Sequence, residues 1–172
     1  MASVLRNVQK RTFTTLFAGS FFVLLDCHIL AEEDSLIQPD TNILSMERIF
    51  TGQYSGMQQP NRLVVRDTDQ WRSLWNEVIQ NSQSTKPLPP VDFSHFMVII
   101  AAMGMRRTGG HKIEIEKVYS EKERIEVVVQ EFYPGLGCMV TQELTSPVDI
   151  VTIHRSDKII SFIEHQKSYK CD

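Results

Sequence analysis

The most regular pattern of apolar positions follows Asp67. There, apolar side chains recur at helical spacing and form one stripe: Trp71, Leu74, Trp75, Val78 and Ile79. Asp67 and Gln70 resemble a capping box, which supplies acceptors for the free N–H groups of a first helical turn. Three prolines between positions 87 and 90 cannot continue a helix. The pattern predicts one amphipathic helix whose tryptophans lie in the core. The alternative is that they form a platform for a ligand or partner.

The remaining apolar positions are typical of β-strands. Residues 96–103 form a continuous apolar run, which indicates a strand buried on both faces. Residues 111–116 and 124–132 alternate with period two around a polar turn, as in a β-hairpin with one buried face. Further strands are expected at 43–50, 62–66, 139–144, 149–154 and 159–163. The fold class is therefore a single α+β domain with one amphipathic helix and about seven mostly antiparallel strands.

The amino terminus has the pattern of an export signal. A positively charged start is followed by an apolar run at 16–25, which is shorter than the ~20 residues of a membrane-spanning helix. We expect residues 1–31 to be a signal peptide cleaved after Ala31. Lipidation at Cys27 and an uncleaved anchor remain alternatives. Residues 32–42 are predicted as a linker, 43–165 as the folded domain and 166–172 as a polar tail.

Charge and cysteine content narrow the classes further. The 172 residues carry a net charge of −3, with no basic patch of the kind that binds nucleic acids. After signal cleavage only Cys138 and Cys171 remain, in a compartment where disulfides persist. They either form one intramolecular disulfide or remain as a buried thiol and a thiol in the tail.

Three loops carry more glycine, proline and arginine than a plain core requires: 104–110, 133–138 and 144–147. In the first, Arg106 and Arg107 offer planar guanidinium groups for carboxylates, and adjacent glycines allow close backbone approach. Binding residues concentrate on such loops. Turn chemistry alone is the competing explanation.

No residue pattern indicates catalysis. The histidines at 95, 111, 154 and 165 lack the spacing of a zinc site, and no G-x-S-x-G motif is present. Cys138 is a candidate thiol nucleophile, but nothing in the sequence pairs it with a base. We therefore expect no enzyme activity, no metal and no cofactor.

Two strings, MGMRRTGGHKIEIEKV and PGLGCMVTQELTSPVDIVTI, resemble the PrcB C-terminal domain family over roughly residues 48–163. The family pattern falls on Gly104, Thr108, Gly109, Gly110, Pro134, Thr145 and Pro147. His111 stands where the family is expected to have Tyr. The resemblance implies an exported accessory protein that associates with and stabilises a subtilisin-like protease subunit, without catalytic residues of its own.

The leading hypothesis is an exported, non-enzymatic domain, periplasmic or extracellular, that binds a protein partner. Envelope anchoring is the alternative location; neither nucleic acid nor a transmembrane helix in the mature chain is expected. The candidate partner-binding residues lie on the three loops: Arg106, Arg107, Thr108, Gly109, Gly110, His111, Pro134, Gly135, Gly137, Thr145 and Pro147. The alternatives are a protease inhibitor acting through these loops, an envelope structural or ligand-binding domain, and an enzyme using Cys138.

Overall fold

The computed structural model describes residues 42–81 and 86–171. Within them, one helix and seven strands follow in the order β1 (Met46–Gly52), β2 (Asn61–Val65), α1 (Thr68–Ile79), β3 (Phe96–Ala102), β4 (Lys112–Ser120), β5 (Arg124–Pro134), β6 (Val148–His154) and β7 (Ile159–Tyr169). The predicted α+β class is confirmed. The expected signal peptide and most of the expected linker lie outside the described residues.

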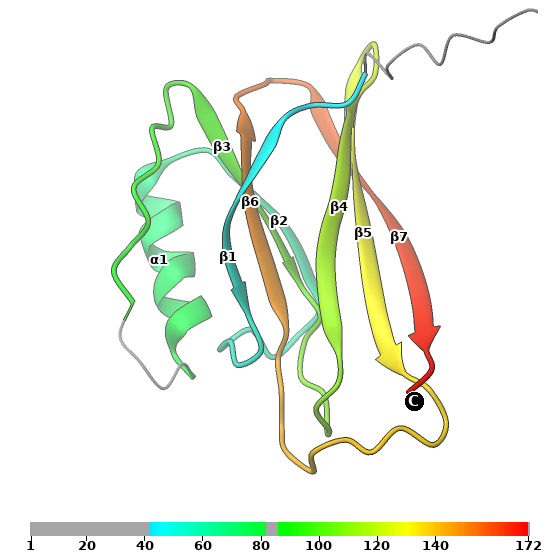
Figure 1. Cartoon of the computed structure of the whole chain (residues 1–172). Helices are drawn as coiled ribbons and strands as arrows, with labels where there is room; N and C mark the ends of the chain where they lie inside the picture. The colour runs from blue at the N-terminus through cyan, green and yellow to red at the C-terminus, as the bar shows by residue number, and fades with distance from the viewer. Residues whose placement is uncertain (1–41, 82–85, 172) are drawn as a thin grey trace, which may run out of the picture. The chain divides into compact units, whose positions relative to one another are not determined.

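The strands divide into two sheets that face each other (Figure 1). One has the order β1-β6-β3-β2 and is antiparallel throughout. The other has the order β4-β5-β7, in which β4 and β5 are antiparallel whereas β5 and β7 are parallel. Helix α1 covers the outer face of the first sheet. The domain is therefore a three-layer arrangement of helix, four-stranded sheet and three-stranded sheet.

Strand β3 is buried on both faces, as its continuous apolar sequence predicts. Met97, Ile99 and Ala101 belong to the core between the two sheets, whereas Val98, Ile100 and Ala102 pack under the helix. Alternate side chains of a strand point to opposite faces, so one uninterrupted apolar run serves two cores.

Helix α1 begins at its predicted cap, where the Asp67 carboxylate accepts the Gln70 backbone N–H at 2.8 Å. Trp71 and Trp75 are only 1% and 3% exposed, and their indole N–H groups donate to the carbonyls of Pro89 and Lys86. The tryptophans are core residues with satisfied donors. They offer no exposed platform for a ligand.

Two expectations for the second half of the chain were wrong. Residues 139–144 form an irregular loop, because their apolar side chains Met139 and Leu144 face solvent and find no neighbouring strand. Strand β7 continues past Ile163 to Tyr169, through residues 166–169 of the expected polar tail. The parallel neighbour β5 supplies backbone partners up to Pro134, so these polar residues need no apolar face to join the sheet.

One pair of sheet edges is joined by polar groups, and we call it the β1–β4 seam. Asp149 of β6, 1% exposed, accepts from Arg48 Nε (2.8 Å), Thr51 Oγ1 (2.9 Å) and the backbone N–H of Ile115 (2.7 Å). Arg48 Nη2 in turn donates to the Ile115 carbonyl (2.8 Å). The edge backbone of β4 at Ile115 is thereby bound by side chains of the opposite sheet.

Candidate functional site

The three loops that the sequence singles out meet at one end of the domain. Arg106 and Thr145 exchange two backbone hydrogen bonds, at 2.7 and 3.0 Å, and Gly109 N–H donates to the Thr141 carbonyl at 3.0 Å. The Thr145 hydroxyl donates to the Thr108 carbonyl at 2.9 Å. We call this region the loop end; it comprises residues 53–60, 103–111, 134–147 and 169–171.

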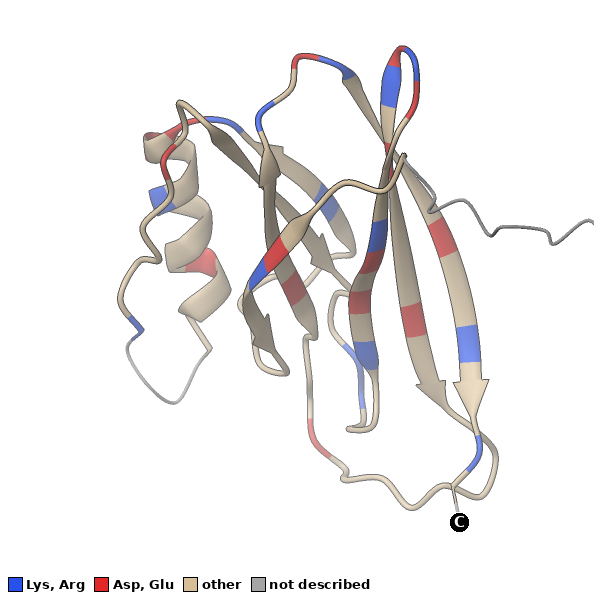
Figure 2. Ribbon diagram, turned by 45° about the horizontal axis from the view of Figure 1, so that its top comes forward, with Lys and Arg blue, Asp and Glu red and all other residues tan. Residues whose placement is uncertain are grey.

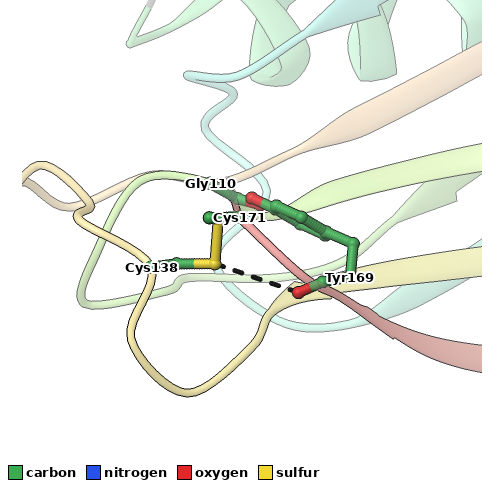
Figure 3. The surroundings of a disulfide bond; sticks show 4 residues. All are labelled: Gly110, Cys138, Tyr169 and Cys171. Carbon is green, nitrogen blue, oxygen red and sulfur yellow. Dashed lines mark hydrogen bonds between the residues drawn. A yellow bond between two sulfur atoms is a disulfide. The ribbon is translucent and has the colours of Figure 1, made fainter.

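A disulfide and a tyrosine hold the end of β7 in this region (Figure 3). Cys138 and Cys171 are bonded, with their Cα atoms 5.2 Å apart. Tyr169 donates its hydroxyl to the Gly110 carbonyl (2.7 Å), and its own carbonyl accepts the Gly135 N–H (2.9 Å). The end of β7 and the residues after it thus connect two of the predicted loops, 104–110 and 133–138.

Three glycines of the loop end, Gly104, Gly110 and Gly137, have positive φ angles that other residues adopt at a cost. Gly110 has φ +81°, and a Cβ at that position would lie 2.9 Å from the Tyr169 hydroxyl oxygen. Gly137 has φ +90° with open space around it, so only its conformation requires glycine. Replacing Gly110 would therefore disturb the contact between β7 and the loop, whereas replacing Gly137 would strain one turn.

An apolar cleft of about 280 Å³ opens on the loop end. Tyr54, Met105 and Leu144 line it with exposed side chains, and Ser55 and Ser146 contribute polar groups below them. The two serines hydrogen-bond to each other (3.0 Å), so their hydroxyls are already engaged inside the protein. The exposed side chains of Gln58 and Asn81 also line the cleft and add a polar margin to its apolar surface.

A second, polar cleft of about 270 Å³ lies between β2 and the β5–β7 pair, which we call the β2–β7 seam; its charged and polar lining includes Arg62, Arg106, Glu131, Tyr133, Glu164 and Gln166. Glu131 is 4% exposed and accepts from Arg62 Nη2 (2.7 Å) and from the Tyr133 hydroxyl (2.5 Å). Arg62 Nη1 also donates to the Ala102 carbonyl (2.7 Å). Its Nε is 3.1 Å from Glu164 Oε1, an ion pair without hydrogen-bond geometry.

Arg106 and His111 border the polar cleft on its loop side. Arg106 donates Nη2 to the Met103 carbonyl (2.8 Å), and its guanidinium lies 5.7 Å from the centre of the Tyr133 ring. His111 packs edge-on against the same ring at 5.5 Å. Burial, and then the positive charge of Arg106, lower the pKa of His111. Burial, and then the hydrogen bond to Glu131, raise the pKa of the Tyr133 phenol.

The structure brings the predicted residues together and adds others. Arg107 differs from Arg106 in facing solvent, away from the clefts. Arg62, Glu131 and Glu164 were missed by the sequence analysis. For Glu131 a signal was present, because it continues the inward-facing series of Ile125, Val127 and Val129 at period two.

The arrangement does not favour bond-making chemistry. Cys138 is bonded to Cys171 and therefore presents no thiol. Within residues 42–81 and 86–171, no three histidine, cysteine or carboxylate side chains gather as a metal ligand set. In the same ranges no helix combines the length and apolarity needed to span a membrane.

A larger hollow of about 480 Å³ lies at the opposite end of the domain, against the β4–β5 turn. Its lining consists largely of the charged side chains of that turn, such as Glu121, Lys122 and Glu123. The turn residues are exposed, and the rest of the lining comes from β5 and from Ile159 and Ser161 of β7, so no loops converge on this hollow. The loop end is the stronger candidate for a binding site.

Comparisons with known proteins gave one match. The family model described as PrcB C-terminal matches residues 97–154, which run from β3 to the end of β6. This is narrower than the span of 48–163 expected from the resemblance. Searches among curated proteins and among solved structures gave no match.

Proposed function

Residues 97–154 of this chain match the family model described as PrcB C-terminal, and from that match we propose that the protein is an exported, non-enzymatic accessory subunit. Its loop end binds a protein partner, a protease subunit, and stabilises it. The observation that carries the proposal is a set of exposed apolar side chains at this end, on loops held by backbone hydrogen bonds and a disulfide. These side chains are Tyr54, Met105, Leu136, Met139 and Leu144.

Exposed apolar side chains favour a protein interface when they gather in one place. Leu136 and Met139 are fully exposed and flank Cys138, so the disulfide limits how far they can move. Met105 and Leu144 are joined through the backbone bonds between Arg106 and Thr145. Loops that are already ordered lose less conformational entropy when a partner binds, which favours affinity.

Export is supported by two features. The amino-terminal segment has the pattern of a signal peptide. The Cys138–Cys171 disulfide suits an oxidising compartment such as the periplasm or the extracellular space, because cytosolic thiols are kept reduced.

The geometry of residues 135–138 favours a stabilising subunit over an inhibitor that mimics substrate. Cys138 N–H donates to the Gly135 carbonyl (3.2 Å), and Gly137 has φ +90°, so Leu136 lies in a tight turn. A segment that binds like a substrate must be extended in order to add to the edge of a sheet. The exposed side chain of Leu136 therefore projects from the turn and can pack into a partner surface.

The test is photo-crosslinking in the organism that makes the protein. Position 136 or 139 carries a benzophenone amino acid, and position 159 carries it in the matched control, because Ile159 is 74% exposed, apolar and at the opposite end. We expect 136 and 139, but not 159, to crosslink a peptidase subunit identified by mass spectrometry. Equal yields at all three positions, or adducts that contain no peptidase, would contradict the proposal.

A functional readout separates stabilisation from inhibition. In cells that carry Leu136→Ser together with Met139→Ser, we expect the crosslinked peptidase to have a shorter half-life and lower activity. Ile159→Ser is the control and should change neither. If the double variant increases peptidase activity, the protein is an inhibitor and the stabilising role is wrong.

A further inference from the structure

Arg106 is the charged group of the polar cleft whose interactions are least complete. Its Nε is buried without an acceptor, and its single side-chain hydrogen bond among the described residues goes to the Met103 carbonyl. In residues 42–81 and 86–171 it forms no ion pair. The buried Nε is closed to solvent, so an incoming acceptor would bind Arg106 where its guanidinium lines the cleft. Hydrogen bonds to a charged group are among the stronger ones in proteins.

The other charges of the cleft are already paired. Both oxygens of Glu131 accept hydrogen bonds, from Arg62 and from Tyr133. Arg62 is shared between Glu131 and Glu164. Neither glutamate lies within ion-pair distance of Arg106, so its positive charge faces the cleft uncompensated.

The surroundings of Arg106 are also cationic. The loop end holds three cationic side chains, Arg106, Arg107 and Lys170, and a single carboxylate, Glu143. The two carboxylates of the polar cleft, Glu131 and Glu164, are already paired with Arg62. The whole chain, by contrast, has a net charge of −3. Figure 2 shows this charge along the loops and the end of β7. Such a local field attracts an acidic partner.

The two clefts lie on either side of one short stretch of backbone. Met105 lines the apolar cleft and Arg106, the next residue, lines the polar cleft. Successive side chains of an extended segment point to opposite sides. One bound segment can therefore reach both clefts with side chains only a few residues apart.

We propose that the loop end recognises an acidic–apolar segment of its partner, with a carboxylate seated on Arg106 in the polar cleft and an apolar side chain in the cleft of Tyr54, Met105 and Leu144. This rests on the proposed function, and it names the chemistry of the partner. Arg106 is the specificity-determining residue, while exposed Arg107 contributes only to the general field. An Arg guanidinium binds carboxylates with charge-assisted hydrogen bonds, which are stronger than neutral ones.

The test uses the mature chain and two synthetic peptides, acetyl-Asp-Gly-Leu-amide and its neutral match acetyl-Asn-Gly-Leu-amide. Binding is followed by NMR through the Arg106 Nε–H, His111 ring and Met105 methyl resonances. We expect the acidic peptide to bind about tenfold to hundredfold more tightly than the neutral one, as an added charge-assisted hydrogen bond implies. Equal affinities would overturn the assignment.

Three variants locate the effect. Arg106→Met should remove the preference for the acidic peptide, Arg106→Lys should keep part of it, and Arg107→Met should keep all of it. Thermal unfolding of each variant establishes that the fold is intact. If Arg107→Met abolishes the preference as strongly as Arg106→Met, the polar cleft is not the site. If acetate shifts the same resonances with the affinity of the acidic peptide, the cleft binds small anions and the partner assignment is wrong.

Crosslinking through position 136 keeps this inference apart from the proposed function. A wild-type yield of peptidase adduct in the Arg106→Met background would contradict the acidic segment while the accessory role stands. Selective peptide binding without any peptidase adduct at positions 136 and 139 would contradict the accessory role while the carboxylate site stands.

Discussion

The two seams between the sheets use similar groups in different ways. At the β1–β4 seam, Asp149 receives three hydrogen bonds, one of them from the backbone N–H of Ile115. At the β2–β7 seam, Glu131 receives two, from Arg62 and from Tyr133, beside a cleft of about 270 Å³. The first seam also borders a cleft, of about 220 Å³, but hydrogen bonds from Asp149 and Arg48 to Ile115 close it down to the backbone of β4. The second is bridged by side chains and leaves donors of Arg62 and Arg106 without acceptors.

This difference indicates which buried charges serve the fold and which remain open to a ligand. A carboxylate whose partners include an edge backbone group has a fixed structural role, because that N–H cannot find another acceptor. A carboxylate held by a hydroxyl and a guanidinium has partners that can rotate or be shared. The open seam, beside the loop end, is therefore the side of the domain suited to binding.

Removing the disulfide should have the largest effect on stability, and the loss of protection should be greatest at the open seam. Cys138→Ala with Cys171→Ala releases a loop of 33 residues, for which the chain-entropy model gives roughly 3.5 kcal/mol of lost unfolding free energy. Urea denaturation measures that loss. Hydrogen exchange should show a larger loss of protection at 166–169 than at 118–120, where Ser120 N–H donates to the Asn42 carbonyl. Equal loss of protection at both seams would contradict the separation.

At the closed seam, Asp149→Asn should reduce the free energy of unfolding by about 3 kcal/mol. The asparagine oxygen can still accept from Arg48 and Thr51, but its NH2 group then faces the Ile115 N–H, which is also a donor. The measurement is urea denaturation, with Thr51→Val as a milder control that removes one donor. A loss below 1 kcal/mol would show that the edge of β4 does not depend on this carboxylate.

The matching change at the open seam, Glu131→Gln, should reduce the free energy of unfolding by less. In Glu131→Gln the amide oxygen can accept from Arg62, and the Tyr133 hydroxyl can turn to accept from the new NH2 group. We expect a loss of about 1 kcal/mol by the same denaturation experiment. A cost equal to that of Asp149→Asn would mean that both seams are equally rigid.

The smallest effect should be a pH dependence at His111. Its pKa is lowered in the folded state from the ordinary 6.5 by burial and by Arg106. The unfolded chain therefore takes up this proton first as the pH falls. Stability is full above pH 6.5 and declines as the pH falls from 6.5 through the lowered pKa. His111→Phe should flatten this part of the stability profile, and NMR titration of Arg106→Met should show a higher His111 pKa.

Much of the scaffold follows from the sequence. Three sequence patterns indicate which faces of their elements are buried. They are the apolar stripe of α1 with its Asp67 cap, the continuous apolar run of β3, and the alternation in β4 and β5. The turn residues and the family resemblance pointed to the three loops, whereas their meeting at one end of the domain is seen only in the structure. The strand expected at 139–144 shows where sequence-based prediction fails. Met139 and Leu144 are exposed on a loop, and strand propensity alone does not distinguish core residues from surface residues.

The clefts were harder to predict because they depend on pairing across sheets. Arg62 and Glu131 are far apart in the sequence, and only the meeting of β2 with β5 brings their charges to 2.7 Å. The inward position of Glu131 is readable from alternation, but its partner is not. The parallel pairing of β5 and β7 was also hidden, because polar residues 166–169 carry no periodic apolar signal.

The parallel pair β5 and β7 imposes an order on folding. A parallel neighbour requires a crossover, and here the chain between the two strands contains β6, which lies in the other sheet between β1 and β3. Because this crossover must close before β7 can pair with β5, these contacts are expected to form after those of the adjacent β4–β5 hairpin. Cys171 lies just beyond the end of β7 at Tyr169, and it comes close to Cys138 when β7 lies beside β5. The disulfide therefore closes a loop that contains β6 and β7, and it fixes the end of β7 to the loop that follows β5.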